Sequence, residues 1–315
     1  MPSRRDFLVG AAGAAGAAIS TSLARRADAP APDPAVPAVR ARVLGIAQDA
    51  GVPQLGCSRS GCVAARRDPS RARRVACLGI AGGPSGGAFL IDATPDIRSQ
   101  AAELGAPIGA ILLTHAHVGH YTGLMYLGRE SMAARALPVH ATARMAAFLR
   151  ANKPWSRLVE WGHVELRPLE AGRSVALAPG IETRPFTVPH RDEDSDTVAF
   201  IVSGPAKRLL YVPDTDAFDR WERPLASVLG EVDAALLDGT FFDAGEIPGR
   251  DPAEVPHPLI RATIDSLRSA APSRCRVIFT HLNHENPALE PGSAAEAAIR
   301  GAGCEVAWEG MELAL

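Results

Sequence analysis

Hydrophobic positions along the chain fall into short runs of strand length that alternate with amphipathic stretches of helical spacing. Most runs are bounded by Gly, Pro or Asp, which is typical of strands and of the turns that end them. The predicted strands cover residues 42–47, 87–92, 110–114, 137–140, 173–178, 182–188, 197–203, 208–212, 233–237, 275–280 and 304–308. The predicted helices cover residues 95–104, 122–135, 142–151, 216–229, 257–270 and 293–302. This order predicts an α/β protein in which helices cover the outer faces of two sheets, a four-layer αββα sandwich.

The start of the chain differs in kind from the rest. The pair Arg4-Arg5 precedes a run rich in Gly and Ala, and a small-residue cleavage pattern follows at Ala27-Asp28-Ala29. This arrangement predicts a signal peptide over 1–29, and the paired arginines resemble the twin-arginine type. A buried or membrane helix is the alternative, but the run is barely long enough to span a bilayer. The prolines of 30–37 predict an extended leader, so the folded domain is expected over 38–315.

The net charge and the predicted export indicate which kinds of partner the protein can have. Residues 1–29 carry four arginines and two aspartates, so their removal changes the net charge from −2 to −4. A mildly acidic protein offers no basic surface for nucleic acid. We therefore expect a periplasmic or secreted protein, exported by the twin-arginine route, with no stable membrane anchor after cleavage and with a small molecule as its substrate. The sequence carries no signal for the oligomeric state.

The cysteines are too few for a disulfide scaffold and odd in number; they are Cys57, Cys62, Cys77, Cys275 and Cys304. In an oxidising compartment the close pair Cys57 and Cys62 is the first candidate for a disulfide. A structural zinc site that recruits further ligands, or two free thiols, are the alternatives.

Three histidines within six residues follow the predicted strand 110–114. They are His115, His117 and His120, and Gly119 lies between the last two. In an extended chain the first two point to the same side, and a turn at the glycine brings the third round. Neutral imidazoles at this spacing are natural ligands for zinc or a similar transition metal. The cluster therefore predicts a metal site.

Further candidate ligands also stand directly after predicted strands. His190 follows 182–188, Asp214 follows 208–212, and His281 follows 275–280. Strand ends can converge on one rim of a sandwich, where loops carry function and sheets hold position. We expect these residues to join the histidine cluster at that rim.

The series of motifs resembles the metallo-β-lactamase superfamily, whose signature is His-x-His-x-Asp-His followed by a lone His, an Asp and a final His, each after a strand. The resemblance implies the metallo-β-lactamase fold and one or two zinc ions, with iron or manganese as alternatives. It implies that His115, His117 and His190 hold one ion, and that Asp214 bridges to a second ion held by His120 and His281. Asp214 and His120 are also the residues that we expect to take part in catalysis.

Residues behind and beside the ligands complete the predicted site. Asp92 resembles the acidic residue that orients a ligand imidazole in this superfamily. Asp238 is either a similar support behind the strand of Asp214 or a turn residue before a glycine. His284, three residues after His281, is a candidate for contact with substrate, although a lone histidine on a loop is more often solvated.

The motif departs from the superfamily at Gly119, which stands where the signature has an aspartate. Glycine has no side chain to ligate a metal, so the second site is expected to be weaker or empty, and replacement of the glycine by Asp is expected to raise its occupancy. Asp243 and Glu285 are candidates for supplying the missing carboxylate. A single zinc with three protein ligands would still support hydrolysis.

Other segments resemble the pyrroloquinoline quinone (PQQ) biosynthesis protein B branch of this superfamily. They include residues 92–98, residues 237–241 and the segment 281–287, which reads His-Leu-Asn-His-Glu-Asn-Pro. His257 resembles part of a Gly-His segment of that branch, or else it begins a helix. The branch implies making, binding or transporting a quinone cofactor or its precursor without hydrolysis.

Three functions follow as alternatives. The leading one is a metal-dependent hydrolase in which water activated by zinc attacks an ester or phosphoester bond. The second is the quinone-cofactor role. The third is a degenerate member without activity, which the glycine of the motif keeps open.

Overall fold

The strands assemble into two sheets. The computed structural model describes residues 39–83, 86–246, 255–269 and 274–315, and in these each sheet has seven strands. The strand orders are β14-β1-β2-β3-β4-β5-β6 and β13-β12-β11-β10-β9-β8-β7. The predicted signal peptide and leader lie outside the described residues.

The strands of the first sheet are β1 (Arg40–Gly45), β2 (Cys77–Ala81), β3 (Ala88–Ile91), β4 (Ile108–Leu112), β5 (Leu137–Ala141), β6 (Val164–Pro168) and β14 (Glu312–Ala314). Those of the second are β7 (Val175–Ala178), β8 (Ile181–Thr187), β9 (Val198–Ser203), β10 (Arg208–Val212), β11 (Ala234–Asp238), β12 (Arg276–Thr280) and β13 (Glu305–Val306). The α-helices are α1 (Ser60–Arg67), α2 (Ile97–Leu104), α3 (Val118–Tyr121), α4 (Ala143–Ala151), α5 (Trp155–Glu160), α6 (Leu225–Leu229), α7 (Ile260–Ser269) and α8 (Ala294–Gly301).

Alternation along the first sheet separates two hydrophobic layers. Phe89 and Ile91 of β3 belong to the cluster that includes buried residues of the second sheet. Leu90, between them, belongs to a second cluster with residues of α2 and α4. Successive side chains of a strand point to opposite faces, so one sheet contributes to both layers.

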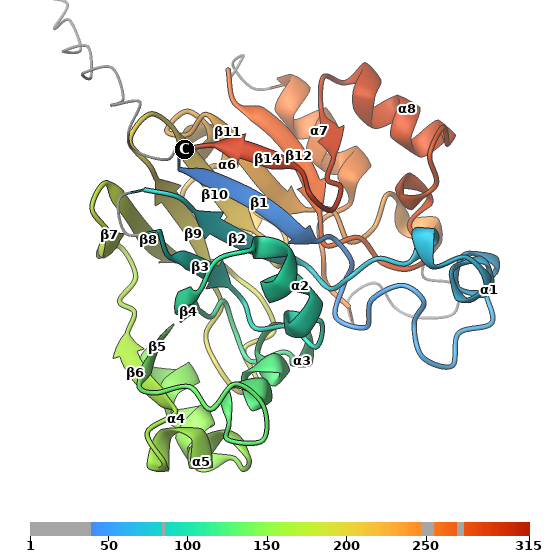
Figure 1. Ribbon diagram of the computed structural model, residues 1–315. Coiled ribbons are helices and arrows are strands. Elements are labelled where there is room, and N and C mark those ends of the chain that lie inside the picture. Colours follow the sequence, from blue (N-terminus) through green and yellow to red (C-terminus); the bar gives the residue numbers. More distant parts are fainter. Residues whose placement is uncertain (1–38, 84–85, 247–254, 270–273) are drawn as a thin grey trace, which may run out of the picture. The chain divides into compact units, whose positions relative to one another are not determined.

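The helices cover the outer faces of both sheets. Ile260 of α7 and Ile299 of α8 belong to the same cluster as the strands of the second sheet, and Figure 1 shows both helices, in orange and red, beside β11 and β12. The α2 and α4 helices take the corresponding place on the first sheet. The four-layer αββα sandwich predicted from the sequence is confirmed.

Two predicted helices are shorter and broken in the structure. The stretch 122–135 forms only a 3-10 helix over Thr122–Leu127, after which Gly128 begins a series of turns. The stretch 216–229 splits into a 3-10 helix over Phe218–Arg220 and the α6 helix, because Pro224 between them cannot continue a helical hydrogen-bond ladder.

The β2 strand was not predicted, because its glycine interrupts a short hydrophobic run. A Cβ at Gly79 would lie 2.6 Å from Leu104 Cδ1 and 2.8 Å from Leu44 Cδ1. Only a residue without a side chain allows α2 and β1 to approach this closely. Helices α1 and α5 and strands β6 and β14 were also missing from the prediction.

Strand direction decides where the chemistry can gather. The neighbours β3, β4, β5 and β6 pair in parallel, as do β10, β11, β12 and β13. The carboxyl ends of each parallel set therefore lie at one edge of its sheet, which is where α/β proteins place ligands. In the described part of the chain no helix has the length and hydrophobicity needed to cross a membrane.

Candidate metal centre

Five of the nine histidines gather where strands of both sheets end. His115 and His117 follow β4 directly, and His120 lies in the short α3 helix that comes next. His190 follows β8, and His281 follows β12. Asp214 follows β10 and lies between the two groups of ligand atoms described next. The structure thus brings together the six residues that the sequence predicted as metal ligands.

The first group consists of His115, His117, His190 and Asp214, whose ligand atoms all lie within 4.8 Å of one another. His190 Nε2 is 3.3 Å from His117 Nδ1 and 3.6 Å from Asp214 Oδ1. Three imidazoles and one carboxylate are a donor set that suits zinc.

The second group consists of His120, His281 and Asp49, again with all ligand atoms within 4.8 Å. Asp214 Oδ2 lies 3.1 Å from His120 Nε2 and 3.2 Å from His281 Nε2. Asp214 therefore has one oxygen beside each group, as a bridging ligand requires.

Buried polar atoms without hydrogen bonds mark the centre. Within the described residues nine buried side-chain nitrogen or oxygen atoms lack a hydrogen-bond partner, and five of them lie in these two groups. They are His115 Nε2, His120 Nε2, His281 Nε2, Asp49 Oδ1 and Asp214 Oδ2. Although some of these atoms are only about 3 Å apart, their directions do not satisfy a hydrogen bond. Unpaired buried polar atoms are costly, and cations held by the two groups would satisfy them, so the residues fit a metal centre.

Hydrogen bonds on the far side of each ring fix the orientation of the imidazoles. Asp92 Oδ2 is 2.7 Å from His120 Nδ1, and Thr114 Oγ1 is 2.9 Å from His115 Nδ1. Thr240 Oγ1 is 2.9 Å from His281 Nδ1. Such contacts leave Nε2 of each ring directed at the centre.

Asp238 supports His257 directly, and it also holds the residue after Asp214. Its Oδ2 lies 2.8 Å from His257 Nδ1 and also accepts a hydrogen bond from Thr215 N. His257 is buried, and a ring nitrogen forms a further group with ligand atoms of Asp214 and His281. The alternative in which His257 merely begins a helix is wrong, because its side chain points into the centre and α7 begins later, at Ile260.

Two residues of the centre have left-handed backbone conformations. Asp92 has φ 73° and His281 has φ 58°. Residues other than glycine adopt this region at a cost, and such strain concentrates at functional sites. Here it turns each side chain as its strand ends.

Burial and charge set the protonation of the ligands. Burial lowers the pKa of His115 well below its usual value and that of His190 to about 4, so both rings are neutral, which is the form that binds metal. Burial also opposes charge on His120, but Asp92 and Asp214 outweigh it and raise the pKa of that ring well above its usual value. Burial opposes the charge of Asp214 as well, yet His281 and His120 hold its pKa well below the usual range. The carboxylates around His120 make this place attractive to a cation.

The carboxylates proposed from the sequence to replace the missing motif aspartate are not at the centre. Asp243 is half-buried and lies 4.0 Å from Arg261, and Glu285 pairs with Arg59 at 2.8 Å. Among the described residues neither belongs to a ligand group at the centre. Asp49, which sequence reasoning missed, stands there instead. The sequence feature that could have identified Asp49 is the one that the other ligands share, a position a few residues after a strand, here β1.

The two cysteines near the start of the domain are free thiols, so the expected disulfide is wrong. Cys57, Cys62 and His284 instead form a third group of ligand atoms within 4.8 Å. Backbone N–H groups donate to both sulfurs, from Gln54 to Cys62 and from Arg59 to Cys57.

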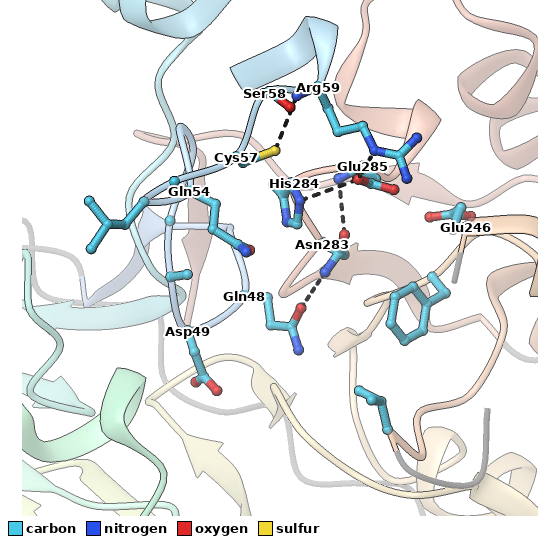
Figure 2. Close-up of a pocket in the computed structure, with 16 residues that line it drawn as sticks. Gln48, Asp49, Gln54, Cys57, Ser58, Arg59, Glu246, Asn283, His284 and Glu285 are labelled. Carbon is cyan, nitrogen blue, oxygen red and sulfur yellow. Dashed lines mark hydrogen bonds and ion pairs between the residues drawn. The ribbon is translucent and has the colours of Figure 1, made fainter. Parts of the chain in front are cut away.

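A pocket of about 790 Å³ extends from Asp49 to Arg59, a volume typical of small-molecule sites. Figure 2 shows Asp49 at one end of this pocket and Cys57 and Arg59 at the other, with polar side chains between them. Among these, Asn283 donates to Gln48 across 2.6 Å. His284, the predicted substrate contact, lines the pocket and so lies in the space that leads to the centre.

Comparisons of sequence and of structure with known proteins find relatives in the same superfamily. The profile of the Beta-lactamase superfamily domain matches residues 88–282. Coenzyme PQQ synthesis protein B of Methylobacterium sp. (strain 4-46) is 31% identical over 88% of this chain and 100% of its own length. The crystal structure of Zn(2+)-bound PqqB from Methylobacterium extorquens has a TM-score of 0.77 and 25% identity, covering 88% of this chain and 100% of that one. A diphosphatase of the PhnP family, with a TM-score of 0.62 and 21% identity over 88% of this chain and 97% of its own, shares the fold.

Proposed function

Because this chain belongs to the β-lactamase superfamily and keeps two adjacent groups of metal ligands, we propose that it is a metal-dependent hydrolase of ester or phosphoester bonds in a small molecule. The observation that carries the proposal is the set of five buried ligand atoms that have no hydrogen bond and lie in the two ligand groups. A purely structural histidine cluster would satisfy these atoms internally, as buried polar groups in proteins normally do.

Zinc is the proposed ion, with iron or manganese as alternatives. Nitrogen and carboxylate donors with three or four protein ligands suit zinc, and the related PqqB from Methylobacterium extorquens is Zn(2+)-bound in its crystal structure. When bound, such an ion supplies Lewis acidity and lowers the pKa of water to about 7.

The chain's own residues provide binding, orientation and proton transfer. Asp214 stands between the two ligand groups and keeps its charge, since His281 and His120 hold its pKa low. His257 is fixed by Asp238 and has its ring 5.3 Å from that of His190 and 5.8 Å from that of His281. We assign to His257 the transfer of a proton at the reacting bond. Polar side chains of the pocket would hold the rest of the substrate.

Metal content and turnover test the proposal together. Protein purified without added metal should contain at least one zinc, iron or manganese per chain and should hydrolyse generic ester or phosphodiester probes. His115→Ala should lose both metal and turnover, whereas His163→Gln, which changes a histidine outside the ligand groups, should keep both. A metal content near zero that soaking does not raise would refute the proposal.

A second candidate function is a role in making, binding or transporting a quinone cofactor or its precursor. The observation that favours it is the match to coenzyme PQQ synthesis protein B along the whole length of that relative. Metal without turnover of any probe, together with restored PQQ production when this chain replaces that protein in a deletion strain, would favour this role over hydrolysis.

We also propose that the protein works outside the inner membrane after twin-arginine export. The support is the sequence of residues 1–29, with its paired arginines and small-residue cleavage pattern. A protein exported in folded form can acquire its metal in the cytoplasm, where availability helps to decide which ion is bound.

A further inference from the structure

We propose that Asp49, from the loop after β1, supplies the carboxylate of the second metal group in place of the residue at position 119. The inference rests on the proposed function only in requiring a metal centre. Asp49 Oδ1 lies 3.2 Å from His120 Nε2, and the ligand atoms of Asp49, His120 and His281 all fall within 4.8 Å.

Asp49 occupies the space that a side chain at position 119 would need. A Cβ built on Gly119 would lie 2.3 Å from Asp49 Oδ1, 3.0 Å from its Cγ and 2.7 Å from its Cα. Real Cβ atoms do not approach other atoms this closely. The glycine is therefore not a simple loss of a ligand, because the same space is filled by a carboxylate from elsewhere in the chain.

The orphaned oxygen of Asp49 independently indicates a ligand. Asp49 Oδ1 is buried and has no hydrogen bond, although the side chain as a whole is 26% exposed. A carboxylate at the edge of a pocket could turn this oxygen toward water, yet it faces His120. An ion held by Asp49, His120 and His281 would satisfy this oxygen.

The loop of Asp49 is fixed to the segment that carries His281. Gln48 N donates to Leu282 O across 2.9 Å, and Leu282 N donates to Ile46 O across 2.7 Å. The side chain of Asn283 donates to Gln48 as well. These bonds on both sides of Asp49 hold its carboxylate in register with His281, which is the support that a metal ligand requires.

Asp49 also joins the second group to the pocket. It is one of the residues that line the pocket, and Figure 2 shows it at the end opposite Cys57. A small molecule in the pocket would therefore meet the second metal group at Asp49. The first group contains His117 and His190 instead of Asp49.

The assignment predicts different effects for two variants that both place an aspartate at position 119. Gly119→Asp restores the superfamily signature, but its Cβ collides with the backbone of Asp49, so the second group should be damaged rather than repaired. The swapped variant Asp49→Gly/Gly119→Asp removes the contacts with Asp49 Oδ1 and Cγ but keeps the contact of 2.7 Å with the Cα of position 49. It returns one carboxylate to the same space after a small shift of the loop.

Titration of the metal-free full chain with Zn²⁺ against a chromophoric chelator tests this assignment, with bound zinc also measured by elemental analysis. The unchanged protein should bind two ions per chain, and Asp49→Ala should bind one. Asp49→Asn, which preserves shape, should weaken the second ion by at least about 10-fold, and Gly119→Asp should weaken it too. The swapped variant should regain part of what Asp49→Gly loses, because only the contact with the Cα of position 49 remains. Glu285→Gln is the matched control in a pocket carboxylate outside the second group, and it should retain both ions.

The outcomes separate this inference from the proposed function. Two ions of unchanged affinity in both Asp49→Ala and Asp49→Asn would overturn the assignment and leave the hydrolase proposal standing. So would saturation of the unchanged protein by a single ion. A Gly119→Asp variant that binds the second ion as tightly as the unchanged protein would overturn the claim that Asp49 fills the space at position 119. An unchanged protein that binds no zinc would overturn the proposed function as well.

Discussion

Replacement of Asp92 by Asn should weaken metal binding through His120, without removing any ligand. Asp92 is fully buried. One carboxylate oxygen lies 2.7 Å from His120 Nδ1, and the other accepts from Thr114 N at 2.9 Å. Asparagine keeps the shape and one acceptor oxygen, so the bond from the threonine backbone can survive. The amide nitrogen then faces the imidazole, and the charge-assisted bond that orients the ring is lost.

The magnitude follows from that one lost bond. Hydrogen bonds to charged groups are worth about 1.5 to 3 kcal/mol. Loss of the partner behind a metal-ligating histidine weakens metal affinity by about 10-fold to 100-fold, which corresponds to about 1.4 to 2.8 kcal/mol. The two estimates agree, so Asp92→Asn should weaken the ion beside His120 within that range.

Zinc affinity measured against a chromophoric chelator, with urea unfolding of the metal-free protein in parallel, checks this expectation. Asp233→Asn is the control, because Asp233 accepts a backbone hydrogen bond from Arg208 at the opposite end of β10 from Asp214. The control should leave zinc affinity unchanged. A change below about 2-fold in Asp92→Asn would refute the reasoning, since it would mean that the orientation of the ring does not depend on this carboxylate.

Three further predictions concern other parts of the chain. Burial raises the pKa of Glu246 from 4.5 to about 7, so the folded state holds a proton that the unfolded state releases, and stability should fall as pH rises from 4.5 to about 7. In urea unfolding across that range, the free energy of unfolding should depend less on pH in Glu246→Gln. An equal dependence on pH would contradict this cause. Gly79→Ala should destabilise the protein by about 1 to 3 kcal/mol because its Cβ meets Leu104 and Leu44 in a filled core; a loss under about 0.5 kcal/mol in urea unfolding would show that the core yields. Changing both arginines of Arg4-Arg5 to Lys should leave an uncleaved precursor in the cytoplasm, seen by fractionation and immunoblotting, while the unchanged chain appears outside the inner membrane; normal export of the changed chain would refute the twin-arginine assignment.

Much of the centre could be predicted because its signals are local in the sequence. A hydrophobic run followed at once by His or Asp marks a strand end with chemistry on it, and this holds for His115, His190, Asp214 and His281. The strands themselves carry their signal in the residues that are buried on one or both faces. The αββα order needed only these runs and the helical spacing between them.

The missed features depend on contacts between distant segments. From the sequence, Gly79 indicates a break in a strand. In the structure it lies within β2, where α2 and β1 pack against it. The sequence does not decide the role of His257, because its partner Asp238, which holds the ring, becomes known only from the structure. The expected disulfide is not formed, and the two free thiols of Cys57 and Cys62 share their space with His284. None of these relations is carried by local sequence spacing.

The exchange between Gly119 and Asp49 shows why a missing motif residue is weak support for a missing site. A motif describes which residues lie close in sequence, whereas a metal ion responds only to the positions of donor atoms. Asp49 precedes Gly119 by many residues and comes from a different strand end, yet its carboxylate fills the space where a side chain at 119 would begin. The glycine is then required, because any larger residue would expel the carboxylate. The departure that suggested a weakened second site is, in the folded chain, the condition that lets another ligand enter it.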